Sequence, residues 1–445
     1  MAEPNLLLEA LLARAGISHA GLAKQVNIRS ADLRLRYDHA SVARWIRDHA
    51  IPRDPAPELI CRIIAERLGN DVTLADIGMV RGEATDRLPS LAAAVEQGAA
   101  LWHGDSRGRV PSRIFTGAKA AAPVFEWENP PEDDLIARLG ERRVDTADVA
   151  MLRRARTHFQ EMYRRVGGMP VRPRITALLT QRAAPLLRAS YDNALGRQLY
   201  RAVGGLAALA GVCAYDANQQ PLAQRHLFTA LRLAKASGDR QFGAYVVALL
   251  ANQALYLEER RLVVQYAESA LRAGGPSLSP ALVTDLHALA GKAYARMGDA
   301  RASHPHLRTS ATIAANLGQH HGHDEVSYVQ PGLIETQLAE ALRRLDDLPA
   351  ARIYAEESVR TAGSTHLRGQ VHRYAGLALI LTAQGELDRG VHVAERMLDR
   401  ADGMDSGRLH DRVAHVTRAL RPHAGEPVVA AYLERADEYL YLKES

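Results

Sequence analysis

Apolar residues recur at intervals of three and four along nearly every segment from Asp145 to the end of the chain. This spacing places apolar side chains on one face of an α-helix, and no convincing alternation typical of a strand appears after residue 135. Asp145 is a suitable cap for the first of these segments, which ends at Gly167 and Gly168. The pattern predicts that this part of the chain is entirely α-helical.

Five segments of this helical part share one spacing of small, larger and turn residues. The first copy runs from Gly211 through Ala214 to Asn218, and then to Ala223. The turn positions of the five copies are Asn218, Glu258, Gly298, Asp346 and Gly385. The small positions that follow are Ala223, Val263, Ser303, Ala351 and Gly390, at steps of 40, 40, 48 and 39 residues.

This pattern resembles the tetratricopeptide repeat, with a period longer than the usual length of about 34 residues. Small residues let two helices cross closely, and Gly, Asn or Asp suits a turn that enters the left-handed region. We therefore expect an all-α fold in which a small N-terminal domain precedes a tetratricopeptide-like right-handed helical solenoid. A helical array unrelated to that repeat is the alternative.

The N-terminal segment predicts a compact group of four helices over residues 5–68. Ser18 is a candidate cap for a second helix, whose Leu22, Ala23 and Val26 face inward. A third helix is expected over residues 39–48, and a closing helix is expected to end at Gly69.

The order of these helices resembles the helix-turn-helix of the phage-repressor type, also called the XRE or Cro type. The resemblance is carried by LAKQVN, by VARWIRDHAIPR and by a closing helix that ends in LG. One departure is IRSADLRLRYDH, which is longer than the usual turn before the third helix and could displace that helix or contact phosphates.

In that family the third helix enters the major groove of double-stranded DNA. The resemblance implies base contacts by His39, Ser41 and Arg44, with Val42 and Trp45 packed inside. It implies phosphate contacts by Lys24, Arg34, Arg36, Arg47 and Arg53. Such small domains usually bind DNA as pairs, so a homodimer is implied, joined through the repeats.

The overall charge gives only modest support for DNA binding, because 56 basic and 51 acidic residues leave a formal net charge of only +5. Clustering is more informative, since residues 29–53 hold six arginines against three acids. An ordinary solvated helix face could carry the same charges, so this count does not decide the matter.

Glycine and proline punctuate residues 102–134, where several apolar residues also suggest packing onto a domain. We expect a helix-turn-helix domain over residues 1–78, a connecting segment and linker over 79–134, and the repeat domain over 135–445.

Cys61 and Cys213 each lie within apolar helical patterns and match no metal-binding spacing, which predicts buried, reduced thiols. The lack of a recognisable secretory signal favours a cytoplasmic protein.

The first helix of each repeat is expected to line a concave inner surface. The repeat register places nine polar residues there: Tyr215, Tyr245, Asn252, Tyr256, Lys292, Arg296, Arg343, Arg344 and His372. Asn252 could hold a peptide backbone, and Lys292 with Arg296, four residues apart, could hold a carboxylate or phosphate. A solvated groove without a ligand is the alternative.

Over nearly its full length the chain resembles actinobacterial regulators that join an N-terminal helix-turn-helix to tetratricopeptide-like repeats. The segments that carry this resemblance are APVFEWENPPEDD, RRVDTADVAMLRRARTHFQEMYRRVGG and AYDANQQPLAQRHLFTALRLAKASGDRQFGAYVVALLANQALY. It implies a sequence-specific transcriptional regulator whose repeats mediate dimerisation and sense a peptide, protein or small molecule. The alternative is a tetratricopeptide scaffold whose helix-turn-helix is degenerate.

No enzymatic motif is recognisable, so no catalytic residue and no cofactor are expected. The histidines of QHHGHDE, namely His320, His321 and His323, together with His304 and His306, could in principle bind zinc. Adjacent histidines in a loop are usually solvated, and we expect no metal site.

Overall fold

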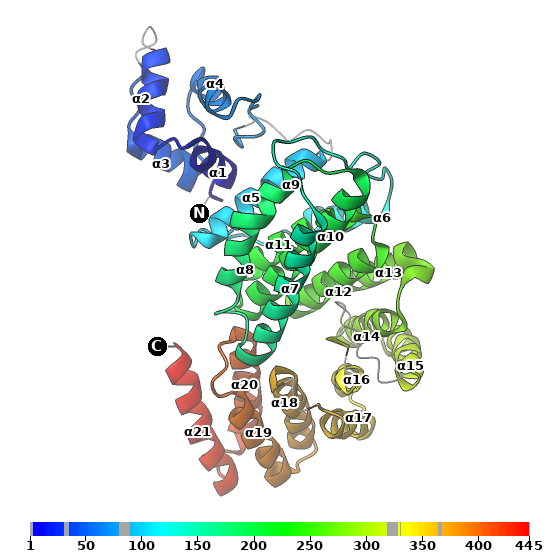
Figure 1. The fold of residues 1–445 in the computed structure, drawn as a ribbon. Helices are drawn as coiled ribbons and strands as arrows, with labels where there is room; N and C mark the ends of the chain where they lie inside the picture. Colours follow the sequence, from blue (N-terminus) through cyan, green and yellow to red (C-terminus); the bar gives the residue numbers. More distant parts are fainter. Residues whose placement is uncertain are drawn as a thin grey trace. The chain divides into compact units, whose positions relative to one another are not determined.

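The computed structural model describes residues 3–30, 35–79, 90–317, 328–329, 331–363 and 367–444. These ranges are all-helical, and their only β-type pairing consists of two isolated bridges, Arg138 with Tyr191 and Arg143 with Ser190. The predicted all-α class is therefore confirmed (Figure 1).

The chain divides into two compact units whose segments interleave along the sequence. One unit holds residues 1–115, 135–146 and 173–199, and the other holds residues 116–134, 147–172 and 200–445. No boundary falls at residue 78, where one was expected, whereas one does fall at the expected residue 134. The units still differ from the expected domains, because each takes part of the expected linker and part of the region from residue 135 to residue 199.

The first unit begins with four short helices that share one apolar core. That core is formed by residues between Leu8 and Met79, among them Leu22, Val26 and Trp45. The four helices are α1 (Leu6–Ala15), α2 (His19–Arg29), α3 (His39–Arg47) and α4 (Ala56–Leu68).

The remainder of the first unit packs against these helices from later in the sequence. Helix α5 (Leu91–Ser106) contacts α1, and its Glu96 pairs with both Arg14 and Arg188. Arg188 follows the continuous segment of α8 (Arg172–Leu178), η2 (Leu179–Ala183) and α9 (Ala184–Leu187). The carboxylate of Glu96 therefore links α5 to Arg188, which lies more than 90 residues later in the sequence.

In its described residues the second unit contains six consecutive pairs of helices, preceded by α7 (Thr146–Val166). The first helix of the first pair, α10, begins before this unit's boundary at Tyr200. From α11 onward each helix packs on the next one along the chain, as in a helical solenoid, and Gly211 of α10 lies against Leu227 of α11. The pairs are α10 (Asn193–Asp216) with α11 (Gln220–Ser237), α12 (Arg240–Tyr256) with α13 (Arg260–Gly274), α14 (Pro280–Arg296) with α15 (Ala300–Ala315), α16 (Leu333–Arg344) with α17 (Leu348–Arg360), α18 (Leu367–Ala383) with α19 (Leu387–Ala401), and α20 (Gly407–Leu420) with α21 (Pro427–Glu444).

The turns inside the first five pairs have the same backbone geometry. All five predicted turn residues have positive φ, from 59° at Asn218 to 79° at Gly385. The residue after each turn donates its backbone N–H to the carbonyl five positions earlier, as Asp299 does to Tyr294 at 3.0 Å. The predicted left-handed turns are confirmed, even where the residue is Glu258.

The small positions of the repeat lie where the two helices of a pair cross. Ala223, Ser303 and Ala351 are completely buried, and Ser303 donates a 2.8 Å hydrogen bond to the carbonyl of Gly291. A Cβ on Gly291 would lie only 2.5 Å from the side chain of Leu307. Larger residues at these positions would force the paired helices apart.

Part of the expected linker is a helix, α6 (Ala118–Glu128), that packs on α11 and α13 of the array. Trp127 is buried against Gly243, and the carbonyl of Ala120 accepts a 2.7 Å hydrogen bond from Tyr266. Lys235 donates to the carbonyl of Asn129 at 2.8 Å. The prediction that this segment packs onto a domain is confirmed, although its helical form was not foreseen.

The second unit also brings its two ends together. The carboxylate of Asp216, at the end of α10, accepts hydrogen bonds from Gly168, Arg368 and Ser406 at 2.8 Å each. The backbone N–H of Asp405 also donates to the carbonyl of Val166. The helices that begin the array therefore contact those near its end.

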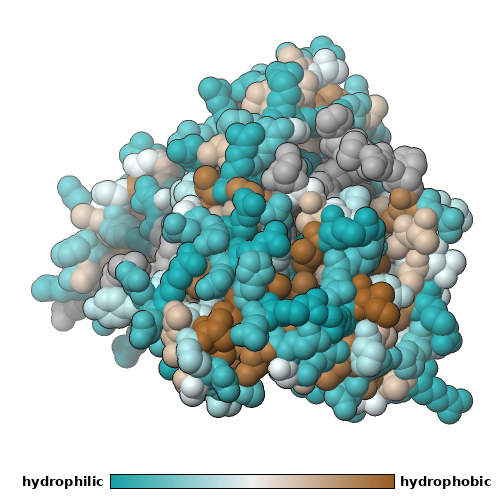
Figure 2. Space-filling model, turned by 90° about the horizontal axis from the view of Figure 1, so that it is seen from below, coloured by the Kyte–Doolittle hydropathy of each residue, from teal (hydrophilic) through white to brown (hydrophobic). Residues whose placement is uncertain are grey.

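Apolar residues are concentrated between the helices, and Figure 2 shows mostly hydrophilic side chains with separate hydrophobic patches on the face in view. Cys61 and Cys213 are both buried and unpaired, as predicted. Among the described residues, no single helix has the length and apolar character of a membrane span; α1 and α2 meet that test only as a pair bent by 90°.

Candidate functional site

The first candidate site is the exposed face of α3, which begins at His39 as the sequence predicted. Val42, Trp45 and Ile46 are buried against the other helices of the N-terminal core, so the opposite face points away from that core. His39 and Arg44 lie on the exposed face. A short helix is thus held by its apolar side and presents a polar side.

Tyr37, just before α3, is tied to α2 by the side chain of Asn27. Asn27 donates to the carbonyl of Tyr37 at 2.8 Å and accepts from the backbone N–H of Tyr37 at the same distance. The ring of Tyr37 meets that of Trp45 edge-on at 4.9 Å between centroids. These contacts fix where α3 begins despite the additional residues before it.

Ser41 has a structural role that the sequence prediction missed. It is 8% exposed, and its hydroxyl donates to the carboxylate of Asp38 at 2.7 Å. The same carboxylate accepts from the backbone N–H of Ser41 at 2.8 Å, which completes a capping box at the start of α3. Because its hydroxyl is buried in the cap, Ser41 is poorly placed for the expected base contact.

Most of the expected phosphate-contacting residues are exposed, whereas Arg34 lies outside the described residues. Lys24, Arg36 and Arg53 are exposed. Arg47 is exposed too, but its guanidinium pairs with the neighbouring Asp48 at 3.0 Å. This arrangement can place several positive charges around α3, with Arg47 partly neutralised.

The second candidate site is a pocket of about 280 Å³ inside the second unit. Most of its lining comes from α7 and from the first helix of every pair, α10, α12, α14, α16, α18 and α20. Leu227 of α11 and Tyr328, which precedes α16, complete it. Leucines and valine supply apolar wall at Leu209, Val212, Leu249 and Leu289. The first helices therefore converge on one pocket, as expected for the concave side of such an array.

Five of the nine predicted groove residues line this pocket: Tyr215, Tyr245, Asn252, Lys292 and His372. Tyr256 and Arg296 lie beside it and contact lining residues. Arg343 lines a smaller neighbouring pocket that shares Glu340 and His372. Arg344 is exposed and lines neither pocket.

Lys292 and Arg296 do hold a carboxylate, but it belongs to the chain itself. The ammonium of Lys292 lies 3.0 Å from one oxygen of Glu340, and Arg296 lies 2.6 Å from the other. Arg412 approaches the same carboxylate at 3.8 Å. Burial alone would raise the pKa of Glu340, but the three cations hold it well below its usual range.

Arg408 occupies an aromatic corner of the pocket. Its guanidinium lies 3.6 Å from the ring centroid of Tyr256 and 4.9 Å from that of Tyr215. The nearest carboxylate, that of Asp411, is 3.8 Å away and also accepts from Tyr256 and Asn218. This stacking holds the guanidinium in place with little counter-charge.

Two other ionisable groups of the pocket are shifted toward their neutral forms. Burial raises the pKa of Asp285, against the effect of hydrogen bonds from Tyr328 and Gln337. Burial and the charges of nearby arginines lower the pKa of His372 well below its usual range. Near neutral pH, His372 is therefore an uncharged donor and acceptor.

Sequence reasoning missed Arg408 and Arg412 of α20 because the sixth helix pair was not recognised, and it also missed Arg368 at the start of α18. Arg408 and Arg412 are four residues apart on α20, the same spacing that drew attention to Lys292 and Arg296. This four-residue spacing is the sequence feature by which the two arginines could have been found.

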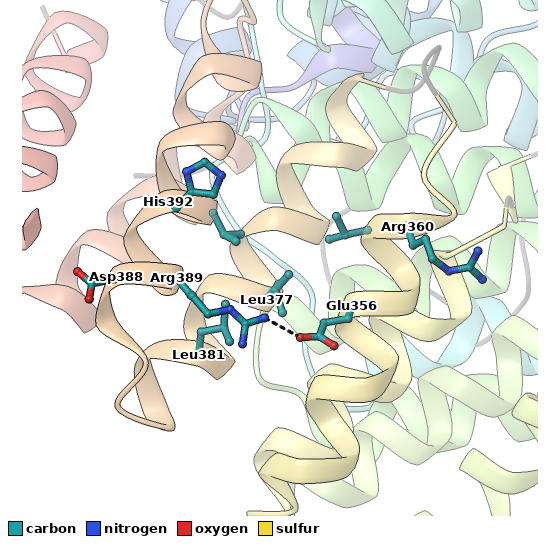
Figure 3. Close-up of a pocket in the computed structure, with 9 residues that line it drawn as sticks. Glu356, Arg360, Leu377, Leu381, Asp388, Arg389 and His392 are labelled. Atoms are coloured by element: carbon teal, nitrogen blue, oxygen red, sulfur yellow. Dashed lines mark hydrogen bonds and ion pairs between the residues drawn. The ribbon is translucent and has the colours of Figure 1, made fainter.

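A larger recess of about 560 Å³ lies among α17, α18 and α19. Arg360, Asp388, Arg389 and His392 in its lining are exposed, and Figure 3 shows Arg389 reaching to Glu356, an ion pair of 3.1 Å. This recess is a solvated junction between successive second helices, with little enclosure for a small molecule.

Most of the histidines considered above as zinc ligands, namely His320, His321 and His323, lie outside the described residues. Of the remaining pair, His306 has its Nδ1 3.0 Å from that of His287. Within the described ranges, no three His, Cys, Asp or Glu side chains are grouped as metal ligands would be.

One family model matches the chain, that of the SP15 N-terminal domain, over residues 8–80. This segment coincides with the N-terminal core of α1 to α4. No curated protein matches the chain. The match therefore concerns the N-terminal core of α1 to α4 and does not extend to the pocket of the helical array.

Proposed function

We propose that this protein is a cytoplasmic, sequence-specific DNA-binding regulator in which α3 reads the major groove and the helical array receives an effector. The observation that carries the proposal is the geometry of α3. One side of this short helix is buried in the core of α1 to α4, while the other presents His39 and Arg44 to the surroundings.

In this proposal, Arg44 contacts base edges and exposed cations around it contact phosphates. Arginine donates twice to guanine in the major groove, whereas lysine and arginine on neighbouring segments bind the backbone without reading sequence. The phosphate-contacting set is Lys24, Arg36, Arg47 and Arg53, to which Arg34 is added from the sequence prediction.

The helical array supports the second half of the proposal, because it encloses a pocket distant in sequence from α3. We propose that the array also joins two copies of the chain, since one small DNA-binding domain supplies limited affinity. Sedimentation of the protein with DNA fragments of different lengths tests this pairing, because it measures how many copies of the chain each fragment binds.

Genome-wide immunoprecipitation of the full chain, followed by gel shifts on the recovered sites over a salt series, tests the proposal. We expect a few specific sites that remain bound at moderate salt, with affinity falling steeply as salt rises. Binding without sequence preference, or no binding at moderate salt, would overturn it and favour a protein-interaction scaffold with a degenerate N-terminal domain.

A further inference from the structure

The pocket of the helical array carries more positive than negative charge. Its lining cations are Arg164, Lys292, Arg368, Arg373, Arg408 and Arg412, against the carboxyl groups of Asp285 and Glu340. Two further carboxylates, Asp216 and Asp411, pair with the arginines from outside the lining. Four acids thus face six cations, and burial favours the neutral form of one of those acids, Asp285.

Three buried polar atoms of residues that line the pocket have no hydrogen-bond partner in the described part of the protein: Nε of Arg408, Oε1 of Gln337 and Oε1 of Gln160. Arg408 and Gln337 are the more deeply buried of the three residues, at 9% and 7% exposed. An unsatisfied buried donor or acceptor costs about 1–3 kcal/mol, so native proteins seldom keep one without a purpose. Arg408 offers a donor to an anion, and Gln337 offers an acceptor to a hydroxyl or amino group.

The size and the walls of the pocket indicate which class of ligand it can hold. A volume of about 280 Å³ lies just below the usual range of ligand pockets, which is about 300–1,000 Å³. Apolar and aromatic side chains such as Leu289 and Tyr245 line it beside the charged groups. The pocket therefore suits a compact organic molecule rather than a length of polypeptide.

We infer that this pocket binds a small organic anion, with a carboxylate or phosphate held by Arg408 and Arg412 and an apolar part against the leucine and tyrosine walls. Arg408 is already held between Tyr215 and Tyr256, so little rotamer freedom is lost when the anion binds. The inference rests on the proposed function only in assigning this anion the role of effector.

Calorimetric titration of the full chain without DNA tests the binding itself. The probes are benzoate, phenyl phosphate, inorganic phosphate and the neutral phenol. We expect benzoate or phenyl phosphate to bind at least about tenfold more tightly than phenol, a difference of about 1.4 kcal/mol. Comparing benzoate with phenyl phosphate shows whether the pocket prefers a carboxylate or a phosphate. Comparing phenyl phosphate with inorganic phosphate shows how much the apolar wall contributes to affinity.

The variant Asn252→Asp adds one negative charge to the exposed part of the lining without changing the size of the side chain. We expect it to weaken binding of the preferred anion by about fivefold or more, through repulsion at an intermediate dielectric. Asn316→Asp, which makes the same charge change at the end of α15, should leave affinity unchanged.

Arg408→Met should abolish selectivity for the anions over phenol, provided that its circular dichroism spectrum matches that of the wild type. Equal affinity for phenol and the two aromatic anions would overturn the inference. So would the absence of binding by every probe at millimolar concentration, or an unchanged affinity in Asn252→Asp. Because no DNA is present, these outcomes are independent of whether α3 reads a sequence.

Discussion

At the scale of single residues, several polar and charged side chains that the sequence suggests are available for a ligand are bound to partners within the fold. Lys292 and Arg296 share a helix face as expected, but their carboxylate is Glu340 in the next helix pair. Ser41 heads the predicted third helix, but its hydroxyl caps that helix. Helical spacing predicts which side chains share a face, whereas their partners depend on tertiary packing.

Replacing Glu340 with Gln should be strongly destabilising, because three cations would lose their common counter-charge. Breaking a buried ion pair by removing one partner costs about 3–5 kcal/mol. Urea denaturation at pH 7 measures the loss. Arg435→Ala, which removes an exposed pair with Asp399, should cost less than about 1 kcal/mol and is the control.

The effect of Glu340 should also depend on pH in a defined direction. Its pKa is depressed in the folded state, so its contribution is fully present above the unfolded-state pKa of about 4.3. That contribution is lost as pH falls through the folded-state pKa. The difference in stability between the wild type and Glu340→Gln should therefore shrink below about pH 4; a difference independent of pH from 3 to 7 would contradict the assignment.

Ser41→Ala distinguishes a capping role from a base-contacting role. We expect the unfolding free energy of the N-terminal unit to fall by about 1 kcal/mol, as for loss of other helix caps. The preference among DNA sequences should be retained. A loss of sequence preference with unchanged thermal stability would restore Ser41 to the DNA interface.

At the scale of helices and turns, the repeat motif predicted five turns and the close crossings beside them. It missed the pair α20 and α21 because this pair is joined by a 3-10 helix, Arg421–His423, rather than by the left-handed turn that defines the motif. Helix α6 was interpreted as part of a linker because of the glycines and prolines of residues 102–134, one of which, Pro123, lies within that helix. Local spacing can predict elements that repeat, but it cannot identify a helix that depends on packing against distant residues.

Two glycines of the same helix pair test the importance of the left-handed turns. Gly385 and Gly376 each have open space where a Cβ would be, but Gly385 has a φ of 79° whereas Gly376 lies inside α18. Gly385→Ala should destabilise the array by about 1 kcal/mol, while Gly376→Ala should stabilise it by about 0.5–1 kcal/mol. The same sign of change in both variants would contradict the role of the turn.

At the scale of the whole molecule, the chain forms two units from interleaved segments, a division that hydrophobic periodicity does not reveal. Within the second unit, Asp216 joins the beginning of the array to α18 and α20. The sequence predicted a concave inner surface, but its closure into a small pocket depends on these contacts across about 190 residues.

Asp216→Ala should loosen the contacts between the beginning of the array and α18 and α20, and it should also lower the free energy of unfolding. The carboxylate is fully buried and accepts three hydrogen bonds, so its removal should cost about 3–5 kcal/mol. Hydrogen exchange should accelerate in residues 166–168 and 405–412 more than in α12 or α13. A uniform acceleration over the array would indicate that Asp216 has only a general effect on stability.

The central claim is that α3 reads DNA sequence through Arg44, and fluorescence anisotropy with sites recovered from the genome tests it most directly. Wild type, Arg44→Ala and Arg47→Ala would be compared on a recovered site and on its single-base variants. Arg44→Ala should lose about 1–3 kcal/mol of discrimination at one base pair, while Arg47→Ala should weaken every sequence alike and reduce the salt slope by about one. Unchanged binding in both variants would contradict this placement of the DNA interface.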